Sequence, residues 1–292
     1  MRVAVVGGGV IGLSCASRLV HAGHAVTVIS EGKPSETTSA IAGGLIYPPG
    51  TRPFDRCAAW TSTSVAEFRG MGGPGIRMMP GRLIHAERVP DPEWTVAMDD
   101  VAWEGATLTF TTAVVDTPVY LDRLAAGVAS AGVRFEYRRV HDLDDVDADL
   151  VVNAAGLGGG DLAGDDSVRA VGGQVVHLAD PGLTEWACNQ GLDPVAYVIP
   201  HGTHVVCGGT EEPGRPDVDP DPDVAAAIVR RCRELVPALA DAPILGTKVG
   251  LRPYRPEVRL ERVGDVIHCY GHGGAGITLS WGCADDVLAL VG

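Results

Sequence analysis

The feature that most restricts the fold of this 292-residue chain is a glycine-rich turn close to its N-terminus. Val3–Val6 is an all-apolar run typical of a central parallel strand, and Gly7–Gly12 follows it with the spacing G-x-G-x-x-G. Ile11–His21 has helical periodicity that ends before Gly23, and Ala25–Ile29 is a second apolar strand. A strand, turn, helix and strand within about 30 residues match a dinucleotide-binding βαβ unit.

Each glycine of this turn has its own physical role in such a unit. Gly7 permits the tight turn, Gly9 lets the backbone approach a pyrophosphate, and Gly12 lets the helix pack closely on the strand. The helix N-terminus then directs positive partial charge at the phosphates. Glu31 follows the second strand, about 20 residues after the turn, where a carboxylate accepts ribose hydroxyls.

Two further stretches distinguish a flavin from a nicotinamide cofactor, which the turn alone does not do. Thr37–Leu45 is rich in hydroxyl and small side chains, which suits a loop beside a phosphate chain, although a plain polar loop has the same composition. Tyr270–Thr278 is a second glycine-rich helix start. Its N–H groups and dipole would stabilise negative charge on the edge of a reduced flavin.

Composition argues against several other functions. The formal net charge of −14 disfavours nucleic acid and anionic membrane surfaces as partners. The seven cysteines are irregularly spaced and include no C-x-x-C pair, so we expect neither a disulfide framework nor a metal site. Free thiols of this kind suit a reducing cytoplasm. The glycines weaken the interpretation of Arg2–Ala16 as a signal peptide, and no apolar run reaches the roughly 18 residues of a membrane span.

Periodicity along the remaining chain predicts alternating helices and strands. The pattern predicts helices over Pro118–Ala131, Asp223–Val236 and Ala275–Leu290. It predicts strands over Val133–Val140, Leu150–Asn153, Gln174–Leu178, Ile199–Gly209 and Val266–Tyr270, and a surface loop over Glu211–Pro222.

These elements predict an α/β protein in which a Rossmann-like domain is interleaved with an antiparallel-sheet α+β substrate domain. We assign residues 1–45, 133–160 and 264–292 to the dinucleotide-binding domain. Residues 46–132 and 161–263 form the predicted substrate domain. The chain would therefore cross between the two domains several times.

Two motifs resemble those of the D-amino-acid oxidase family, whose relatives include glycine and sarcosine oxidases. They are Gly250–Pro256, with the sequence GLRPYRP, and Tyr270–Gly282, with the sequence YGHGGAGITLSWG. The resemblance extends from residue 1 to about residue 286 and implies a two-domain α/β flavoprotein with non-covalent FAD. The D-amino-acid oxidase resemblance is more specific at these two motifs than at the N-terminal glycines.

Position by position, the resemblance implies a substrate site and a cofactor site. Arg252 would hold the substrate carboxylate, Tyr197 would hydrogen-bond to it, and the Gly274 carbonyl would face the substrate amine. The residues expected to contact FAD are Gly7, Gly9, Val10, Ile11, Gly12, Glu31, Thr37, Thr38, Ser39, Gly44, Leu45, Val140, Gly156, Gly271, Gly273, Gly274, Gly276, Ile277 and Thr278. His272 is expected to pack beside the flavin.

Two departures from the family pattern affect the substrate preference. Tyr47 precedes Pro48 where relatives often have glutamine, and Leu178–Tyr197 is short and contains no earlier tyrosine. This lid-like stretch also contains no Lys or Arg, but it contains Asp180, Glu185 and Asp193. A second carboxylate on the substrate would therefore lack a partner, so a neutral side chain is expected.

The resemblance implies oxidation of a neutral D-amino acid by hydride transfer to flavin N5. The imino acid hydrolyses to a keto acid and ammonia, and O2 is reduced to hydrogen peroxide. Two alternatives stay open: a glycine, sarcosine or other secondary-amine oxidase on the same scaffold, and a dinucleotide-binding sensor without turnover. The expected partners are the amino acid and O2, with a homodimer also considered.

Overall fold

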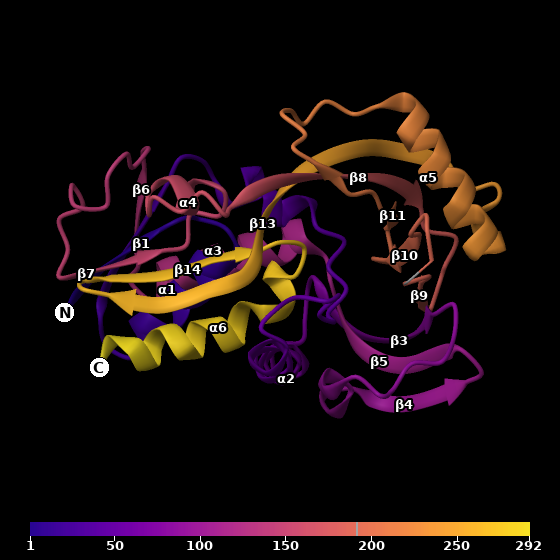
Figure 1. Cartoon of the computed structure of the whole chain (residues 1–292), viewed down its shortest axis with the longest axis horizontal. Coiled ribbons are helices and arrows are strands. Elements are labelled where there is room, and N and C mark those ends of the chain that lie inside the picture. Colours follow the sequence, from indigo (N-terminus) through magenta and orange to yellow (C-terminus); the bar gives the residue numbers. More distant parts are fainter. Residues whose placement is uncertain (191) are drawn as a thin grey trace.

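The computed structural model describes residues 1–190 and 192–292, and Figure 1 shows the whole arrangement. Within this described part, fourteen strands form one mixed sheet in the order β4-β5-β3-β9-β10-β11-β8-β13-β14-β7-β1-β2-β6, and β12 pairs with β8. The sheet has a parallel end and an antiparallel end. The predicted α/β class is confirmed, and both chain termini lie at the parallel end (Figure 1).

The parallel end contains the predicted βαβ unit. Its elements are β1 (Arg2–Val6), α1 (Val10–His21), β2 (Ala25–Ser30), β6 (Arg134–Tyr137), β7 (Leu150–Asn153) and β14 (Val266–His272). Every neighbouring pair in the order β14-β7-β1-β2-β6 is parallel. β1 and β7 are almost entirely buried, which explains their continuous apolar sequences.

Helices cover this end of the sheet and complete its core. They are α2 (Phe54–Met71), α3 (Thr117–Ser130) and α6 (Gly276–Val291). The helix α1 packs against α3 and α6, and α2 packs against α6. Leu13 and Leu19 of α1 are fully buried in this contact, as the helical spacing predicts. Although α2 and α3 belong to the segment assigned to the substrate domain, they pack on α6 and α1 of the dinucleotide-binding domain, and the domain boundaries stay a prediction.

The antiparallel end is built from strands that the sequence predicted only in part. They are β3 (Ile76–Ile84), β4 (Asp99–Glu104), β5 (Thr107–Val115), β8 (Arg169–Ala179), β9 (Trp186–Cys188), β10 (Tyr197–Pro200), β11 (His204–Gly208), β12 (Glu212–Pro213) and β13 (Ile244–Val263). The helix α5 (Pro222–Leu235) packs on β8, β10 and β11 and forms a separate apolar core with them. Short helical turns are η1 (Pro34–Glu36), η2 (Thr38–Ile41), α4 (Gly158–Asp161), η3 (Glu93–Ala97) and η4 (Pro237–Leu239).

The strand β13 joins the two ends of the sheet (Figure 1). Its first part pairs with β8, and its last part pairs with β14. Tyr254 pairs with Arg169 on one side and with His272 on the other, so the changeover lies close to Arg252. A residue at this point reaches both the parallel layer and the antiparallel substrate layer.

Three predicted elements have different bounds in the structure. Ile199–Gly209, predicted as one strand, is the hairpin of β10 and β11, because Gly202 adopts a φ of 87° that reverses the chain. Val133–Val140 is shortened to β6. The loop over Glu211–Pro222 contains β12, and Pro222 belongs to α5, where Asp221 caps the helix through its side chain.

Two properties of the described residues bear on the cellular context. No helix in residues 1–190 and 192–292 combines the length and apolar character that a membrane crossing needs. All seven cysteines are buried free thiols. They pack as small apolar side chains in the cores of both ends of the sheet.

Candidate active site

A cavity of about 1740 Å³ runs along the carboxyl ends of the parallel strands. Its lining includes Gly7 after β1, Glu31 after β2, Gly156 after β7 and His272 at the end of β14. This edge is where open α/β sheets bind their ligands. Pockets for one drug-sized molecule usually measure about 300–1,000 Å³, so this cavity has room for a dinucleotide and a small substrate together.

The structure brings nearly all of the predicted site residues to this cavity. Those that line it are Gly7, Gly9, Val10, Ile11, Glu31, Thr37, Thr38, Ser39, Gly44, Leu45, Val140, Gly156, Tyr197, Arg252, Gly271, Gly273, Gly274, Gly276, Ile277 and Thr278. Gly12 is outside the lining. An added Cβ on Gly12 would lie 1.9 Å from the Gly7 carbonyl oxygen, so its role is to allow α1 to approach the turn.

The glycine turn forms a narrow cradle that side chains would fill. Gly7 has a φ of 122°, and a Cβ there would lie 2.2 Å from the Ala154 carbonyl oxygen. A Cβ on Gly9 would lie 3.1 Å from the Ser39 hydroxyl oxygen. The same hydroxyl accepts a hydrogen bond of 3.1 Å from the Val10 amide. The turn and the loop through Ser39 therefore enclose a groove lined by backbone, which suits a pyrophosphate.

The ribose end of the cavity contains Glu31 with Arg139 opposite. Their side chains form an ion pair of 3.3 Å, and both are mostly exposed, so the pair itself contributes little stability. Val140 lies beside them in the lining. The carboxylate is placed at the strand end where ribose hydroxyls are expected, while its role in binding stays a prediction.

At the opposite end of the cavity, the second glycine-rich segment leads into α6 and lines the cavity. Gly271 and Gly273 adopt φ values of 86° and 54°, conformations that favour glycine. The Thr278 hydroxyl donates a 3.2 Å hydrogen bond to the carbonyl of Tyr47, so it already holds the opposite wall in place. The N-terminus of α6 presents positive partial charge here, which suits the electron-rich edge of a flavin.

The three proposed catalytic residues lie together at this end. The partly buried guanidinium of Arg252 donates a 2.8 Å hydrogen bond to the Thr210 carbonyl. An added Cβ on Gly274 would lie 3.5 Å from Cδ of Arg252, so the two residues are in contact. Within the described chain, no carboxylate forms an ion pair with Arg252. A guanidinium held this way has N–H groups left for an anionic ligand.

Two tyrosines line the cavity, and one of them, Tyr197, lies next to the Arg252 guanidinium. Burial raises the pKa of Tyr197, and the neighbouring Arg252 guanidinium partly opposes this effect. Burial also raises the pKa of Tyr47 well above its usual range, together with the nearby Cys188 thiol, whose sulfur lies 3.7 Å from the phenol oxygen. Both phenols therefore stay protonated hydrogen-bond donors at neutral pH.

The sequence analysis did not assign a role to Tyr47. It noted this residue only as a departure from the family pattern, because the expected second tyrosine was sought within Leu178–Tyr197. In the structure Tyr47 lines the cavity, although it is distant in sequence from Leu178–Tyr197. Cys188, Gln190 and Val195 line the same region and come from the short lid-like stretch.

The acidic residues of that stretch do not line the cavity, which corrects one part of the sequence argument. Asp180 accepts hydrogen bonds from the backbone amides of Gly182 and Gly202, and Glu185 lies 3.4 Å from Arg82. Asp180 and Glu185 lie between β8 and β9, Asp193 lies between β9 and β10, and none of the three belongs to the lining. These carboxylates therefore do not repel an acidic substrate by direct contact.

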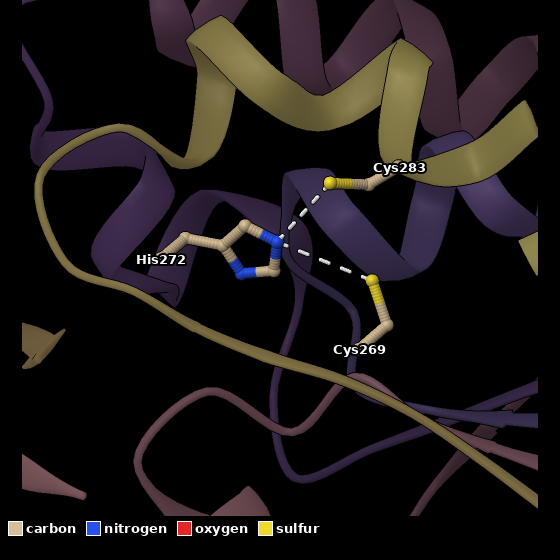
Figure 2. Close-up of side chains that lie close together, drawn as sticks. All are labelled: Cys269, His272 and Cys283. Atoms are coloured by element: carbon tan, nitrogen blue, oxygen red, sulfur yellow. Dashed lines mark hydrogen bonds between the residues drawn. The ribbon is translucent and has the colours of Figure 1, made fainter. Parts of the chain in front are cut away.

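His272 is buried at the cavity wall, as expected for a residue packing beside a flavin. Burial lowers the pKa of its imidazole to about 4, so the ring is neutral at physiological pH. Its Nε2 faces the thiols of Cys269 and Cys283, as Figure 2 shows. Sequence spacing contains no signal for this cluster, because Cys283 belongs to α6 and the other two residues belong to β14.

Comparisons with known proteins agree with this geometry. The family described as FAD dependent oxidoreductase (DAO) matches residues 2–290. The chain is 37% identical over 312 residues to a D-amino-acid oxidase of Rubrobacter xylanophilus, covering 100% of this chain and 96% of the relative. It is 34% identical over 326 residues to the human D-aspartate oxidase, covering 99% and 94% of the two chains.

Solved structures with a similar fold include a glycine oxidase. Glycine oxidase from Bacillus cereus superposes with a TM-score of 0.81 at 21% identity, covering 99% of this chain and 94% of that one. At this identity the likeness concerns the fold alone. The backbone cradle, the cavity volume and the glycine-rich start of α6 all fit the FAD that the matched family uses. This chain belongs to the D-amino-acid oxidase family of FAD-dependent oxidoreductases.

Proposed function

We propose that this protein is an oxidase that converts a neutral D-amino acid to its imino acid, which water hydrolyses to a keto acid and ammonia. The observation that carries the proposal is the partly buried Arg252, which contacts Gly274 and Tyr197 and has no carboxylate partner in the described chain. D-Amino-acid oxidases from Rubrobacter and Streptomyces, 37% and 38% identical, support this reaction class.

The substrate would be held at both of its charged groups. The planar guanidinium of Arg252 suits bidentate capture of the α-carboxylate, and the protonated Tyr197 phenol would donate a further hydrogen bond to it. The Gly274 carbonyl would accept a hydrogen bond from the amine. These contacts would fix two substituents of the α-carbon, and the side of the cavity that holds the flavin would supply the third reference point that distinguishes the two enantiomers.

The cofactor residues would place FAD with its pyrophosphate at the Gly7–Ser39 cradle and its ring at the start of α6. A bound FAD would supply the hydride acceptor and the route for electrons to O2, with hydrogen peroxide as the product. The neutral His272 is not needed as a base, because hydride loss from a substrate with a neutral amine requires none. The protein itself would orient the substrate and exclude water from the cavity.

The preference for neutral side chains rests on how the nearby cations are already engaged. Arg255 lies close to Arg252 in sequence, but it forms a 2.9 Å ion pair with Asp165. Arg52 and Arg169 also line the cavity, but both residues are exposed, and Arg52 lies over the Phe54 ring at 4.9 Å. A second substrate carboxylate would thus lack a buried partner, which costs several kcal/mol in a closed pocket.

One assay tests the reaction and its specificity. Purified protein is screened aerobically for peroxide with D-alanine, D-valine, D-methionine, D-aspartate, glycine and sarcosine, and anaerobically for bleaching of the flavin. We expect the highest kcat/KM with a neutral D-amino acid.

D-Aspartate as the best substrate would contradict the proposed neutral pocket, and Arg52→Ala would then test whether Arg52 supplies the cation. Preference for glycine or sarcosine would favour the secondary-amine alternative, and a bound flavin that no amine bleaches would favour the sensor.

We further propose a cytoplasmic location, because seven buried free thiols suit a reducing compartment. A homodimer also stays a proposal, which light scattering coupled to gel filtration would test. Neither proposal affects the chemistry of the cavity.

A further inference from the structure

Three side chains of metal-ligating type converge at the wall of the cavity, and Cys269 and His272 belong to its lining. Cys269 and His272 come from β14, and Cys283 comes from α6. Their donor atoms all lie within 4.8 Å of one another, and all three residues are buried. Figure 2 shows the imidazole Nε2 pointing at both sulfur atoms. The proposed oxidation does not use this cluster.

The distances are close to those of a tetrahedral zinc site. Zinc bonds of about 2.3 Å to sulfur and about 2.0–2.1 Å to nitrogen place the two donors about 3.6 Å apart. Here Nε2 of His272 lies 3.5 Å from Sγ of Cys283 and 4.0 Å from Sγ of Cys269. A movement of Cys269 by a few tenths of an ångström would therefore bring both nitrogen–sulfur distances close to the value expected for a tetrahedral zinc site.

The ligand chemistry selects the kind of ion. Two thiols and an imidazole are soft or borderline donors, which prefer Zn²⁺ and related thiophilic ions to Ca²⁺ or Mg²⁺. A third thiol, that of Cys15 on the buried face of α1, lies next to Cys269. Its sulfur is outside the group of donor atoms that all lie within 4.8 Å of one another, so the structure supplies three protein ligands, Cys269, His272 and Cys283.

The simpler alternative is that the thiols are only small apolar core residues. Cys207 and Cys232 show this arrangement in the second core, where they pack together without a histidine. The cluster at His272 differs because an imidazole nitrogen is directed at two sulfurs and makes no hydrogen bond to a carboxylate or carbonyl through that atom. Sulfur is a weak hydrogen-bond partner, so this arrangement is better explained by metal coordination.

We propose that Cys269, His272 and Cys283 bind one Zn²⁺ or another thiophilic divalent ion. The ion links β14 to α6, which are the two elements on either side of Gly273–Ala275. It therefore fixes the ends of the turn that borders the cavity. The ion has a structural role and takes no part in the oxidation of substrate.

Metal content tests the proposal without relying on activity. The purified flavin-loaded protein is incubated with Zn²⁺, dialysed and measured by inductively coupled plasma mass spectrometry, and we expect one zinc per chain. Cys283→Ala should lose it, because groups that merely orient a ligand are already worth about 10- to 100-fold in metal affinity. Cys207→Ala is the matched control: it removes an equally buried thiol from the second core and should retain the ion.

A second measurement uses the unmodified protein, so the test does not depend on folding of the Cys283 variant. Loading with ¹¹³Cd²⁺ should give one NMR resonance in the range of sites with at least two thiolate ligands, and His272→Asn should shift or abolish it. Zinc that does not survive dialysis, zinc retained in a folded Cys283→Ala protein, or a cadmium resonance from oxygen ligands alone would each overturn the proposal.

Discussion

At the scale of single residues, the function depends on how Arg252 is held. Its side chain is anchored by the Thr210 carbonyl and contacts Gly274, while Arg255 beside it is neutralised by Asp165. Two arginines separated by two residues therefore have different environments. One has N–H groups left for a ligand, and the other is part of the framework.

We expect Arg252→Ala to lose most activity and to keep FAD. Losing one partner of a desolvated charge pair costs about 2–5 kcal/mol. This corresponds to a fall in kcat/KM of about 30-fold to several-thousand-fold. Steady-state kinetics and the flavin absorption spectrum check the two parts of the prediction. Arg252→Lys is the control, because it keeps the charge but not the planar fork, and it should fall between the two proteins. Near-normal kcat/KM in the alanine variant would exclude the carboxylate role.

Tyr197→Phe should have a smaller effect, since one hydrogen bond is lost and the arginine stays. A net hydrogen bond of about 0.5–1.5 kcal/mol corresponds to a loss of about 2- to 13-fold in kcat/KM. The raised pKa of Tyr197 keeps the phenol protonated, so the loss should not vary between pH 7 and pH 9. Tyr47→Phe is the companion variant, whose hydroxyl contacts Cys188. A larger loss in Tyr47→Phe would identify Tyr47 as the principal substrate tyrosine.

At the scale of elements, the cofactor site depends on two tight backbone segments, the turn after β1 and the start of α6. At the turn after β1 an added Cβ on Gly7 or Gly12 would collide with backbone atoms, whereas at the start of α6 the positive φ values of Gly271 and Gly273 favour glycine. Ser39 packs against the turn after β1, since its hydroxyl accepts from the Val10 amide and borders Gly9. The turn and the Thr37–Ser39 loop consequently act as one unit.

We expect Gly9→Val to abolish FAD binding in a protein that still folds. The added Cβ would lie 3.1 Å from the Ser39 hydroxyl oxygen, and the two further methyl groups would occupy the groove assigned to the pyrophosphate. Gly127→Ala in α3 is the control, since a Cβ there meets nothing within 4 Å and favours the helix. The flavin-to-protein absorbance ratio is the measurement. A full complement of flavin in soluble Gly9→Val protein would contradict the assigned turn.

At the scale of the whole molecule, Asp165 links the segment after α4 to both strands at the junction of the sheet. Its carboxylate accepts hydrogen bonds from Ser167, from the Arg255 guanidinium at 2.9 Å and from the Tyr270 hydroxyl at 2.9 Å. Arg255 belongs to β13 and Tyr270 to β14, so one side chain connects elements from both ends of the sheet. This places an acidic group at the centre of a partly buried network.

Stability should therefore fall in acid in a manner that depends on Asp165. Hydrogen bonds from Ser167, Arg255 and Tyr270 hold the pKa of Asp165 below its usual value, against the effect of burial. Because the folded-state pKa is lowered, the contribution is fully present above the unfolded pKa of about 3.9 and is lost as pH falls below it. Asp165→Asn should lower the free energy of unfolding at pH 7 by about 1–3 kcal/mol. Urea denaturation at pH 7 and pH 3 measures this, and an equal difference at both values would contradict the linkage.

The sequence by itself determined the dinucleotide turn, the parallel strands and the glycine-rich start of α6, because each follows from backbone geometry and spacing within a few residues. The tertiary structure alone decided that Tyr47 lies beside Cys188, that Asp165 engages Arg255, that the acids of Leu178–Tyr197 lie outside the cavity, and that Cys283 meets His272. The length of β13, which joins the two ends of the sheet, was also absent from the sequence pattern. These contacts join elements distant in sequence, and their geometry is set by strand pairing and helix packing, which local spacing does not specify.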